Sequence, residues 1–357
     1  MLSQEKQEQI AIIVINVLRG RFESFPADAS KNRNAPFHKA FLEAFTNRLQ
    51  PVSSNVPYLV SLSSWLHGLD TTLGQTFFEG VAHVLSDGEK REFAVGELTI
   101  SSSQQQTISR IMSDLKNGKE HPSIQRENHL IFTMDDSEII DNEKFAADNF
   151  VETSDYVEAI ELKTVRPNSG IAYGEKQKIL KGKAGLWRKH PEKQIRFYIA
   201  FPFDPLNDTA TGSNKSRLMK FLIEFDKYFD PNEVLVAEEL WNHLSGSEKT
   251  MEEILQIINR IATPEFLNRY DYLSNSDNRH KDRKEYINLL NEWYLFRERW
   301  LVEHDDDIMR CCKSKKRLER FYNQTVFTSD GEYNEKRYSK LSECLKAKYL
   351  INSFKDP

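Results

Sequence analysis

The sequence has little cysteine: only three thiols among 357 residues, two of them adjacent (Cys311, Cys312) and one distant (Cys344). This usage gives neither an even disulfide framework nor the paired C-x-x-C spacing of a zinc site, so we expect reduced thiols. No run approaches 18 uninterrupted apolar residues, and the opening MLSQEKQEQ is polar where a signal peptide would be basic and then apolar. These absences predict a cytoplasmic protein with no membrane contact.

Two common groups of catalytic motifs are also absent. No G-x-x-x-x-G-K-[ST] loop exists, which argues against a nucleotide cofactor, and none of the nine histidines forms H-E-x-x-H. Any metal chemistry should therefore use carboxylates.

Positive charge is scarce overall but concentrated locally. The net charge of −5 argues against a purely electrostatic nucleic-acid binder. Between Lys163 and Arg196, however, ten Lys/Arg stand against two Glu, a balance of +8. A second basic run, Arg310 to Arg320, is typical of a solvated helix face.

The hydrophobic pattern predicts a mixed α/β (α+β) fold. We expect an N-terminal helical region (1–57), a core (58–265) and a helical C-terminal region (266–357) that completes one unit with the core. In the first region, Phe37, Phe41 and Phe45 form a stripe expected to contact the core. Further helices are expected over 70–86, with Asp70 or Thr71 as N-cap and a stop at Asp87-Gly88, and over 174–190, 215–228, 234–243, 250–261 and 283–303.

Four segments predict the strands of a mixed central sheet, namely 129–134, 145–152, 156–164 and 195–201. The last two flank the basic helix 174–190. Strand, helix, strand in this order is a crossover unit, so these two strands should be parallel neighbours.

The segments 145–152 and 156–164 predict a hairpin that carries acids. A turn about Ser154-Asp155 sets residues whose numbers sum to about 309 opposite each other, which pairs Asp148 with Glu161 at roughly 5 Å. Asp155 is an alternative second acid, although aspartate is favoured at turns for geometry alone. Asp136 or Asp141 would require a different strand pairing.

Glu161 and Lys163 lie two apart on one strand and therefore share a face. Carboxylates are the hard oxygen ligands that Mg²⁺ prefers, and an ammonium group can position an attacking water and offset charge in the transition state. Asp148, Glu161 and the Leu162 carbonyl are the predicted metal ligands, with Lys163 as the catalytic cation. This equipment suits metal-dependent phosphodiester hydrolysis.

The pattern Asp148 … Glu161-Leu-Lys163 resembles the PD-(D/E)xK nuclease superfamily, although Ala147 stands where the superfamily name has proline. The flanking residues resemble its TdeIII family of type II restriction endonucleases. The resemblance covers roughly residues 60 to 260 and includes the segments 73–79, 161–168, 174–180, 200–205 and 239–246.

This resemblance implies a PD-(D/E)xK core and cleavage of double-stranded DNA, with Mg²⁺, at a short palindromic site, commonly an interrupted GGNCC. It implies a homodimer from a restriction-modification system, with Glu79 as a further catalytic member. The basic stretch supplies candidates for phosphate contacts. They are Lys176, Lys178, Lys181, Lys183, Arg188 and Lys189, while Arg166 and Asn168 are candidates for reading base edges.

Two alternatives stay open at the level of the sequence. A repair or recombination nuclease of the same fold would cut without strict site preference. A non-catalytic DNA-binding protein would carry the E-x-K by chance, because such triplets are common in a chain with 29% charged residues.

Overall fold

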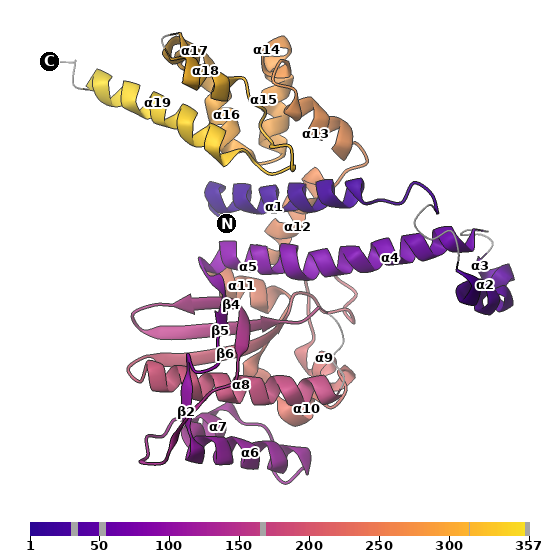
Figure 1. Ribbon diagram of the computed structural model, residues 1–357, viewed down its shortest axis with the longest axis vertical. Helices are drawn as coiled ribbons and strands as arrows, with labels where there is room; N and C mark the ends of the chain where they lie inside the picture. The colour runs from indigo at the N-terminus through magenta and orange to yellow at the C-terminus, as the bar shows by residue number, and fades with distance from the viewer. Residues whose placement is uncertain (30–34, 50–54, 165–168, 314, 354–357) are drawn as a thin grey trace. The chain divides into compact units, whose positions relative to one another are not determined.

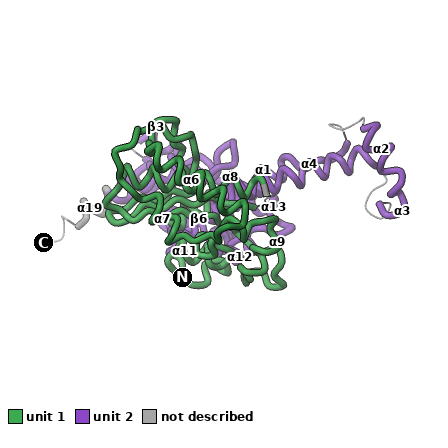
Figure 2. The backbone as a smooth tube through the Cα atoms, turned by 90° about the horizontal axis from the view of Figure 1, so that it is seen from below, with its two compact units in different colours: residues 1–2, 78–253 green, residues 3–77, 254–357 purple. Residues whose placement is uncertain are grey.

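In the computed structural model the chain forms two units: residues 1–2 with 78–253 (unit 1) and residues 3–77 with 254–357 (unit 2), coloured separately in Figure 2. The structure describes residues 1–29, 35–49, 55–164, 169–313 and 315–353. None of the helices in these ranges is both long and apolar enough to span a membrane.

Unit 1 is built on a five-stranded mixed sheet of order β1-β4-β5-β6-β7. The strands β2 and β3 form a second, two-stranded antiparallel sheet. The strands are β1 (Glu89–Phe93), β2 (Thr99–Ser101), β3 (Ile139–Asp141), β4 (Phe145–Glu152), β5 (Tyr156–Leu162), β6 (Gln194–Phe201) and β7 (Val234–Val236).

Helices cover both faces of this sheet (Figure 1). On one side α5 contacts β4 and α11, and on the other α8 contacts β6, α6 and α10. The helices of unit 1 are α5 (Glu79–Ser86), α6 (Ser102–Lys116), α7 (Ile124–Ile131), α8 (Ser169–Lys189), α9 (Lys215–Phe221), α10 (Phe225–Tyr228), the 3-10 turn Pro231–Glu233 and α11 (Glu238–Ser245). The predicted fold class, a mixed sheet flanked by helices with a helical C-terminal part, is confirmed.

Unit 2 is mainly helical in its described residues, with an isolated β-bridge between Phe327 and Tyr333. Its C-terminal part packs around an apolar cluster that includes Leu301, Ile308, Leu341 and Leu345. Its helices are α1 (Gln4–Glu23), α2 (Pro36–Leu42), the 3-10 turn Glu43–Phe45, α3 (Thr46–Leu49), α4 (Val56–Thr72), α13 (Phe266–Ser274), α14 (Asn278–Lys281), α15 (Arg283–Glu292), α16 (Phe296–Glu303), α17 (Asp305–Cys312), α18 (Lys316–Tyr322) and α19 (Glu335–Ser353). Two elements, the π-helix Leu73–Phe78 and α12 (Thr250–Ile261), include residues of both units.

The crossover β5-α8-β6 has the predicted parallel pairing, with Glu161 beside Ile199. Strand β5 is the middle strand, and its apolar side chains are buried, which matches its near-continuous run of valine, alanine, isoleucine and leucine. Helix α8 approaches β6 closely at Gly182, where an added Cβ would lie 2.9 Å from the Phe197 ring. A glycine is required there because a larger residue would push the helix away from the sheet.

Several expected elements differ in the structure: the helices expected over 215–228 and 283–303 are each broken into two, α9 with α10 and α15 with α16. The first half of residues 129–134, expected as a strand, belongs to α7, because Ser123 caps that helix by accepting the Arg126 N–H. Residues 234–243, expected as a helix, begin as β7, and Ala237 at φ 52° separates this strand from α11. The helix expected from Asp70 already begins at Val56, although it ends at Asp87 as predicted.

The predicted core role of the phenylalanine stripe in α2 and the following turn is wrong. Phe37, Phe41 and Phe45 are 79%, 78% and 53% exposed. The segment lies close to α4, but the phenylalanine side chains stay exposed, so helical spacing does not by itself predict burial.

Candidate active site

The hairpin β4-β5 has the register predicted from the sequence. Asn149 pairs with Ile160 and Glu152 with Val157, so numbers across the hairpin sum to 309. Extending this register by one pair sets Asp148 opposite Glu161. The Leu162 N–H donates to Asp148 Oδ2 at 2.8 Å, which holds the aspartate against the chain that carries Glu161.

Lys163 follows β5 directly and remains tied to the sheet. Its N–H donates to the Ala200 carbonyl at 2.8 Å, continuing the parallel ladder beyond the last strand residue. Its Nζ donates to Glu161 Oε1 at 2.7 Å and lies 2.8 Å from Glu175 Oε1. Burial lowers the pKa of Lys163, but attraction to Glu161 and the hydrogen bonds to both glutamates outweigh it, so the pKa is raised. The group is therefore an ammonium at neutral pH and cannot serve as a general base.

Asp148 is a half-buried carboxyl in a negative environment. Burial, followed by the charge of Glu161, raises the pKa of Asp148 to about 6 despite the Leu162 hydrogen bond. Buried like charges of this kind are stabilised by a cation that binds both. A divalent cation bound by Asp148 and Glu161 would therefore relieve the repulsion between the two carboxylates.

Glu79 reaches this group through a lysine. Its Oε2 accepts from Lys90 Nζ at 2.9 Å, and the same Nζ lies 3.9 Å from Asp148 Oδ1. One turn further along α5, His83 Nε2 lies 2.7 Å from the Asp148 carbonyl oxygen. Helix α5 therefore presents Glu79 and His83 toward the edge of the sheet that carries Asp148.

Two charged residues of the site were missed by the sequence reasoning. Lys90 belongs to β1, whose pairing with β4 could not be read from its polar sequence E-K-R-E-F. Glu175 lies on the basic helix α8 and entered the sequence analysis only as one of the two glutamates between Lys163 and Arg196. The spacing of Glu175 and Lys178, one helical turn apart, was the available signal.

The alternative second acids lie elsewhere. Asp155 occupies the β4-β5 turn, six residues from Glu161 along an extended strand, which is about 20 Å. Asp141 lies in β3, which pairs with β2 in the other sheet. Asp136 is exposed in the bend before β3. The geometry therefore favours Asp148.

The predicted phosphate contacts divide by burial. Lys178 and Lys189 have side chains 25% and 40% exposed, whereas Lys181 is largely buried and donates to Glu143 Oε1 at 2.6 Å. Arg188 is half-buried. The candidates for base reading, Arg166 and Asn168, lie outside the described residues.

Two of the predicted phosphate contacts are wrong. Lys176 and Lys183 are fully buried, where no phosphate can reach them. Lys176 Nζ donates to Glu127 Oε2 at 2.6 Å and to Glu233, and Lys183 Nζ donates to Glu233 Oε1 at 2.5 Å. Burial opposes ionisation of Glu233, but the two ammonium groups lower its pKa to about 2. These four side chains, the buried ion cluster, fix α8 to its neighbours.

The Glu233→Gln variant should therefore lose about 3 kcal/mol of unfolding free energy, because it leaves two buried ammonium groups with one carboxylate. Urea unfolding measures the loss. Glu143→Gln is the matched control, since that glutamate also pairs with a lysine but is 75% exposed, and its effect should stay below about 1 kcal/mol. Equal effects of the two changes would contradict a stabilising role for the cluster.

The residues present fit a magnesium ion. Mg²⁺ is commonly held by one or two carboxylates and otherwise keeps its waters, and Asp148, Glu161 and the Leu162 carbonyl offer only hard oxygen ligands. Among the described residues no three His, Cys, Asp or Glu side chains form a ready metal cage. A site of two carboxylates completed by a carbonyl and water is consistent with both observations.

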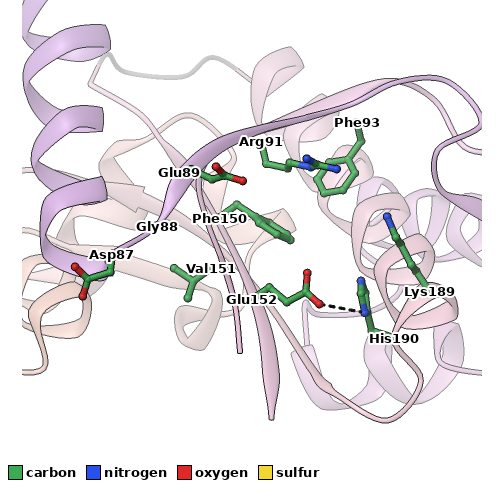
Figure 3. Close-up of a pocket in the computed structure, with 10 residues that line it drawn as sticks. All are labelled: Asp87, Gly88, Glu89, Arg91, Phe93, Phe150, Val151, Glu152, Lys189 and His190. Carbon is green, nitrogen blue, oxygen red and sulfur yellow. Dashed lines mark ion pairs between the residues drawn. The ribbon is translucent and has the colours of Figure 1, made fainter. Parts of the chain in front are cut away.

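A hollow of about 380 Å³ lies at the β1 edge of the sheet, between β4 and the end of α8. Figure 3 shows Glu152 of β4 facing His190, whose Nδ1 lies 3.6 Å from the carboxylate. Of the predicted functional residues its lining contains Lys189 but not Asp148, Glu161 or Lys163. The hollow is therefore separate from the acidic pair.

Comparison with known proteins assigns the chain to a family. Residues 2–262, more than half of the chain, match the family described as type II restriction endonuclease, HinfI, and the chain belongs to this family. It is therefore a site-specific deoxyribonuclease, a hydrolase that binds double-stranded DNA, as predicted. The family that matches is HinfI, whereas the motifs alone had suggested the TdeIII family.

Among individual proteins, the type II restriction enzyme MjaII of Methanocaldococcus jannaschii is 41% identical over 370 residues. The alignment covers 98% of this chain and 99% of MjaII. The similarity therefore includes the C-terminal helices that the family match leaves out. Type II restriction endonucleases generally use a divalent metal ion, which agrees with the acidic pair.

Proposed function

We propose that this chain cleaves both strands of a short palindromic DNA site in a Mg²⁺-dependent reaction, as a homodimer with a PD-(D/E)xK active site in each subunit. The observation that carries the proposal is the meeting of Asp148 and Glu161 across the β4-β5 hairpin, with the Lys163 ammonium on Glu161. A homodimer gives each strand of a palindrome its own active site.

Asp148, Glu161 and the Leu162 carbonyl would hold the ion. When bound, Mg²⁺ would polarise the scissile phosphate and lower the pKa of a coordinated water. Lys163, kept charged by its two glutamates, orients the attacking water and offsets the negative charge that develops on the phosphate. Glu79 keeps Lys90 beside Asp148, which limits the repulsion among the acids.

DNA contacts are proposed for those predicted residues that the structure does not show to be buried. Lys178, Arg188 and Lys189 are candidates for phosphates, and Arg166 and Asn168 for base edges. The TdeIII resemblance makes an interrupted GGNCC the first recognition sequence to test.

Plasmid digestion followed by sequencing of the ends tests the reaction and its specificity together. In Mg²⁺ we expect discrete fragments whose ends share one short palindrome, and with EDTA no cleavage, because the acidic pair then lacks its ion. Smeared products would instead indicate a nuclease without strict site preference. Cleavage that persists in EDTA would contradict the metal-dependent mechanism.

A further inference from the structure

Glu175 is an acid of the active site for which the E-x-K motif provides no role. It lies on α8 with its side chain 17% exposed, and its Oε1 is 2.8 Å from Lys163 Nζ. Its Oε2 is buried and, within the described part of the chain, accepts no hydrogen bond. The Nζ of Lys178, one helical turn away, stands 3.7 Å from that oxygen. A buried carboxylate oxygen without a hydrogen-bond donor costs free energy, so this oxygen of Glu175 calls for an explanation.

Glu161 presents the opposite situation. Its Oε1 accepts from Lys163 at 2.7 Å and its Oε2 from Lys178 at 2.6 Å, so a lysine occupies each oxygen. A carboxylate oxygen has a second lone pair, but a magnesium ion that shares it with an ammonium group is repelled by that positive charge. Binding of an ion at Glu161 is therefore favoured when at least one lysine moves to another acceptor.

We propose that Glu175 is a positioning residue that receives Lys178 when Glu161 binds its metal ion, while it continues to hold Lys163 beside the reacting phosphate. This inference rests on the proposed function, in which Glu161 is a metal ligand. The movement is short, because Lys178 Nζ must close a gap of 3.7 Å to a hydrogen bond of about 2.8 Å. It gives the unpartnered Oε2 a donor and keeps both lysines neutralised near the DNA.

Metal binding without DNA tests this directly. Mn²⁺ takes the same oxygen ligands as Mg²⁺, and electron paramagnetic resonance measures its free concentration during a titration of the full chain. We expect Glu175→Gln to weaken Mn²⁺ binding about 10-fold, since a neutral amide cannot stabilise the displaced ammonium. Glu143→Gln, a glutamate that pairs with Lys181 away from the acidic pair, is the matched control and should leave Mn²⁺ binding unchanged.

The Lys178→Met variant tests whether this lysine competes with the metal ion at Glu161, or whether Glu175→Gln only disturbs the structure. Removing the competing ammonium should tighten Mn²⁺ binding by about 3-fold or more in the otherwise normal chain. In combination with Glu175→Gln it should restore the affinity lost by that change. These two expectations hold even where one single variant is less stable, because a structural defect would weaken binding in every combination.

Two results would overturn the inference: normal Mn²⁺ affinity in Glu175→Gln, or no gain on removal of Lys178 in either background. Glu161→Gln distinguishes this failure from that of the proposed function. If Glu161→Gln retains Mn²⁺ binding, the assignment of the metal site is wrong. If it abolishes binding while Glu175→Gln binds normally, only the role of Glu175 is wrong.

Discussion

The Lys163→Ala variant should lose about 1,000-fold in the rate of Mg²⁺-dependent cleavage, because it removes the ammonium whose backbone continues the metal-binding strand and which lies against Glu161. The loss should appear in the rate of a single turnover and not in DNA affinity. Lys163 is only 19% exposed and is held by two glutamates, so it contributes little to the charge that attracts DNA. Gel-shift titration in Ca²⁺ and single-turnover cleavage in Mg²⁺ measure the two quantities separately.

Lys144→Ala is the matched control for this experiment. Lys144 also pairs with a glutamate, Glu92, but its side chain is 64% exposed on the β1-β4 edge. It should cleave within about 2-fold of the unchanged protein, since exposed pairs of this kind contribute little. A Lys163→Ala protein that still cleaves would show that the E-x-K triplet is accidental, and the chemistry would have to be sought elsewhere.

The Asp148→Asn variant should abolish cleavage and yet stabilise the metal-free protein. Cleavage should fall about 1,000-fold or more, because the amide is a poor magnesium ligand compared with a carboxylate. Its side-chain oxygen can still accept the Leu162 N–H. Since burial and Glu161 raise the pKa of Asp148 to about 6, the ionised carboxylate destabilises the fold, and neutralising it should add about 1–3 kcal/mol of unfolding free energy at pH 8.

The gain in stability expected for Asp148→Asn depends on pH. The unfolded carboxyl has a pKa near 3.8 and the folded one a pKa of about 6, so the folded state binds the proton more tightly. The unchanged protein therefore loses stability at this residue as pH rises from about 4 to about 6, and the loss is constant above that range. The advantage of Asp148→Asn should grow over the same interval and vanish below it. Thermal unfolding in EDTA across this pH series measures it.

Asp155→Asn completes the comparison. Asp155 lies in the β4-β5 turn, where its main-chain oxygen accepts from the Gln194 N–H and its own N–H donates to Thr153 Oγ1. The variant should cleave normally and show no comparable gain in stability. Loss of cleavage in Asp155→Asn with activity retained in Asp148→Asn would reverse the assignment of the second acid.

The hairpin that carries these acids could be predicted from the sequence because its determinants are local. A two-residue turn region and two strands of known apolar pattern leave one register, and a shift of one residue would turn Glu161 to the opposite face. The crossover to β6 follows from chain order for a similar reason. Both features depend on residues within about 50 positions of each other.

The sequence could not distinguish the buried lysines of α8 from the lysine at the active site. Lys176 and Lys178 are two positions apart and chemically identical, yet one is buried and the other lies at the active site. What separates them is the position of Glu127 and Glu233, which approach from α7 and from the turn before β7. These two acids are 49 and 57 residues from Lys176 in the sequence, so the pattern of charges within the helix does not reveal them. Lys90 was missed for the same reason, since its partners are on α5 and β4.

The alternation along α8 has a further consequence for how this helix can change during evolution. Lys176 and Lys183, seven residues apart, bind one acid in the interior, whereas Glu175 and Lys178 meet the catalytic strand. A single inserted or deleted residue between Lys178 and Lys183 would rotate Lys183 by about 100° away from Glu233 relative to the other three side chains. The spacing of the helix is thus under stronger constraint than the identity of its exposed residues. Related enzymes should therefore vary at the exposed positions of α8 while keeping the number of residues between its buried and active-site positions.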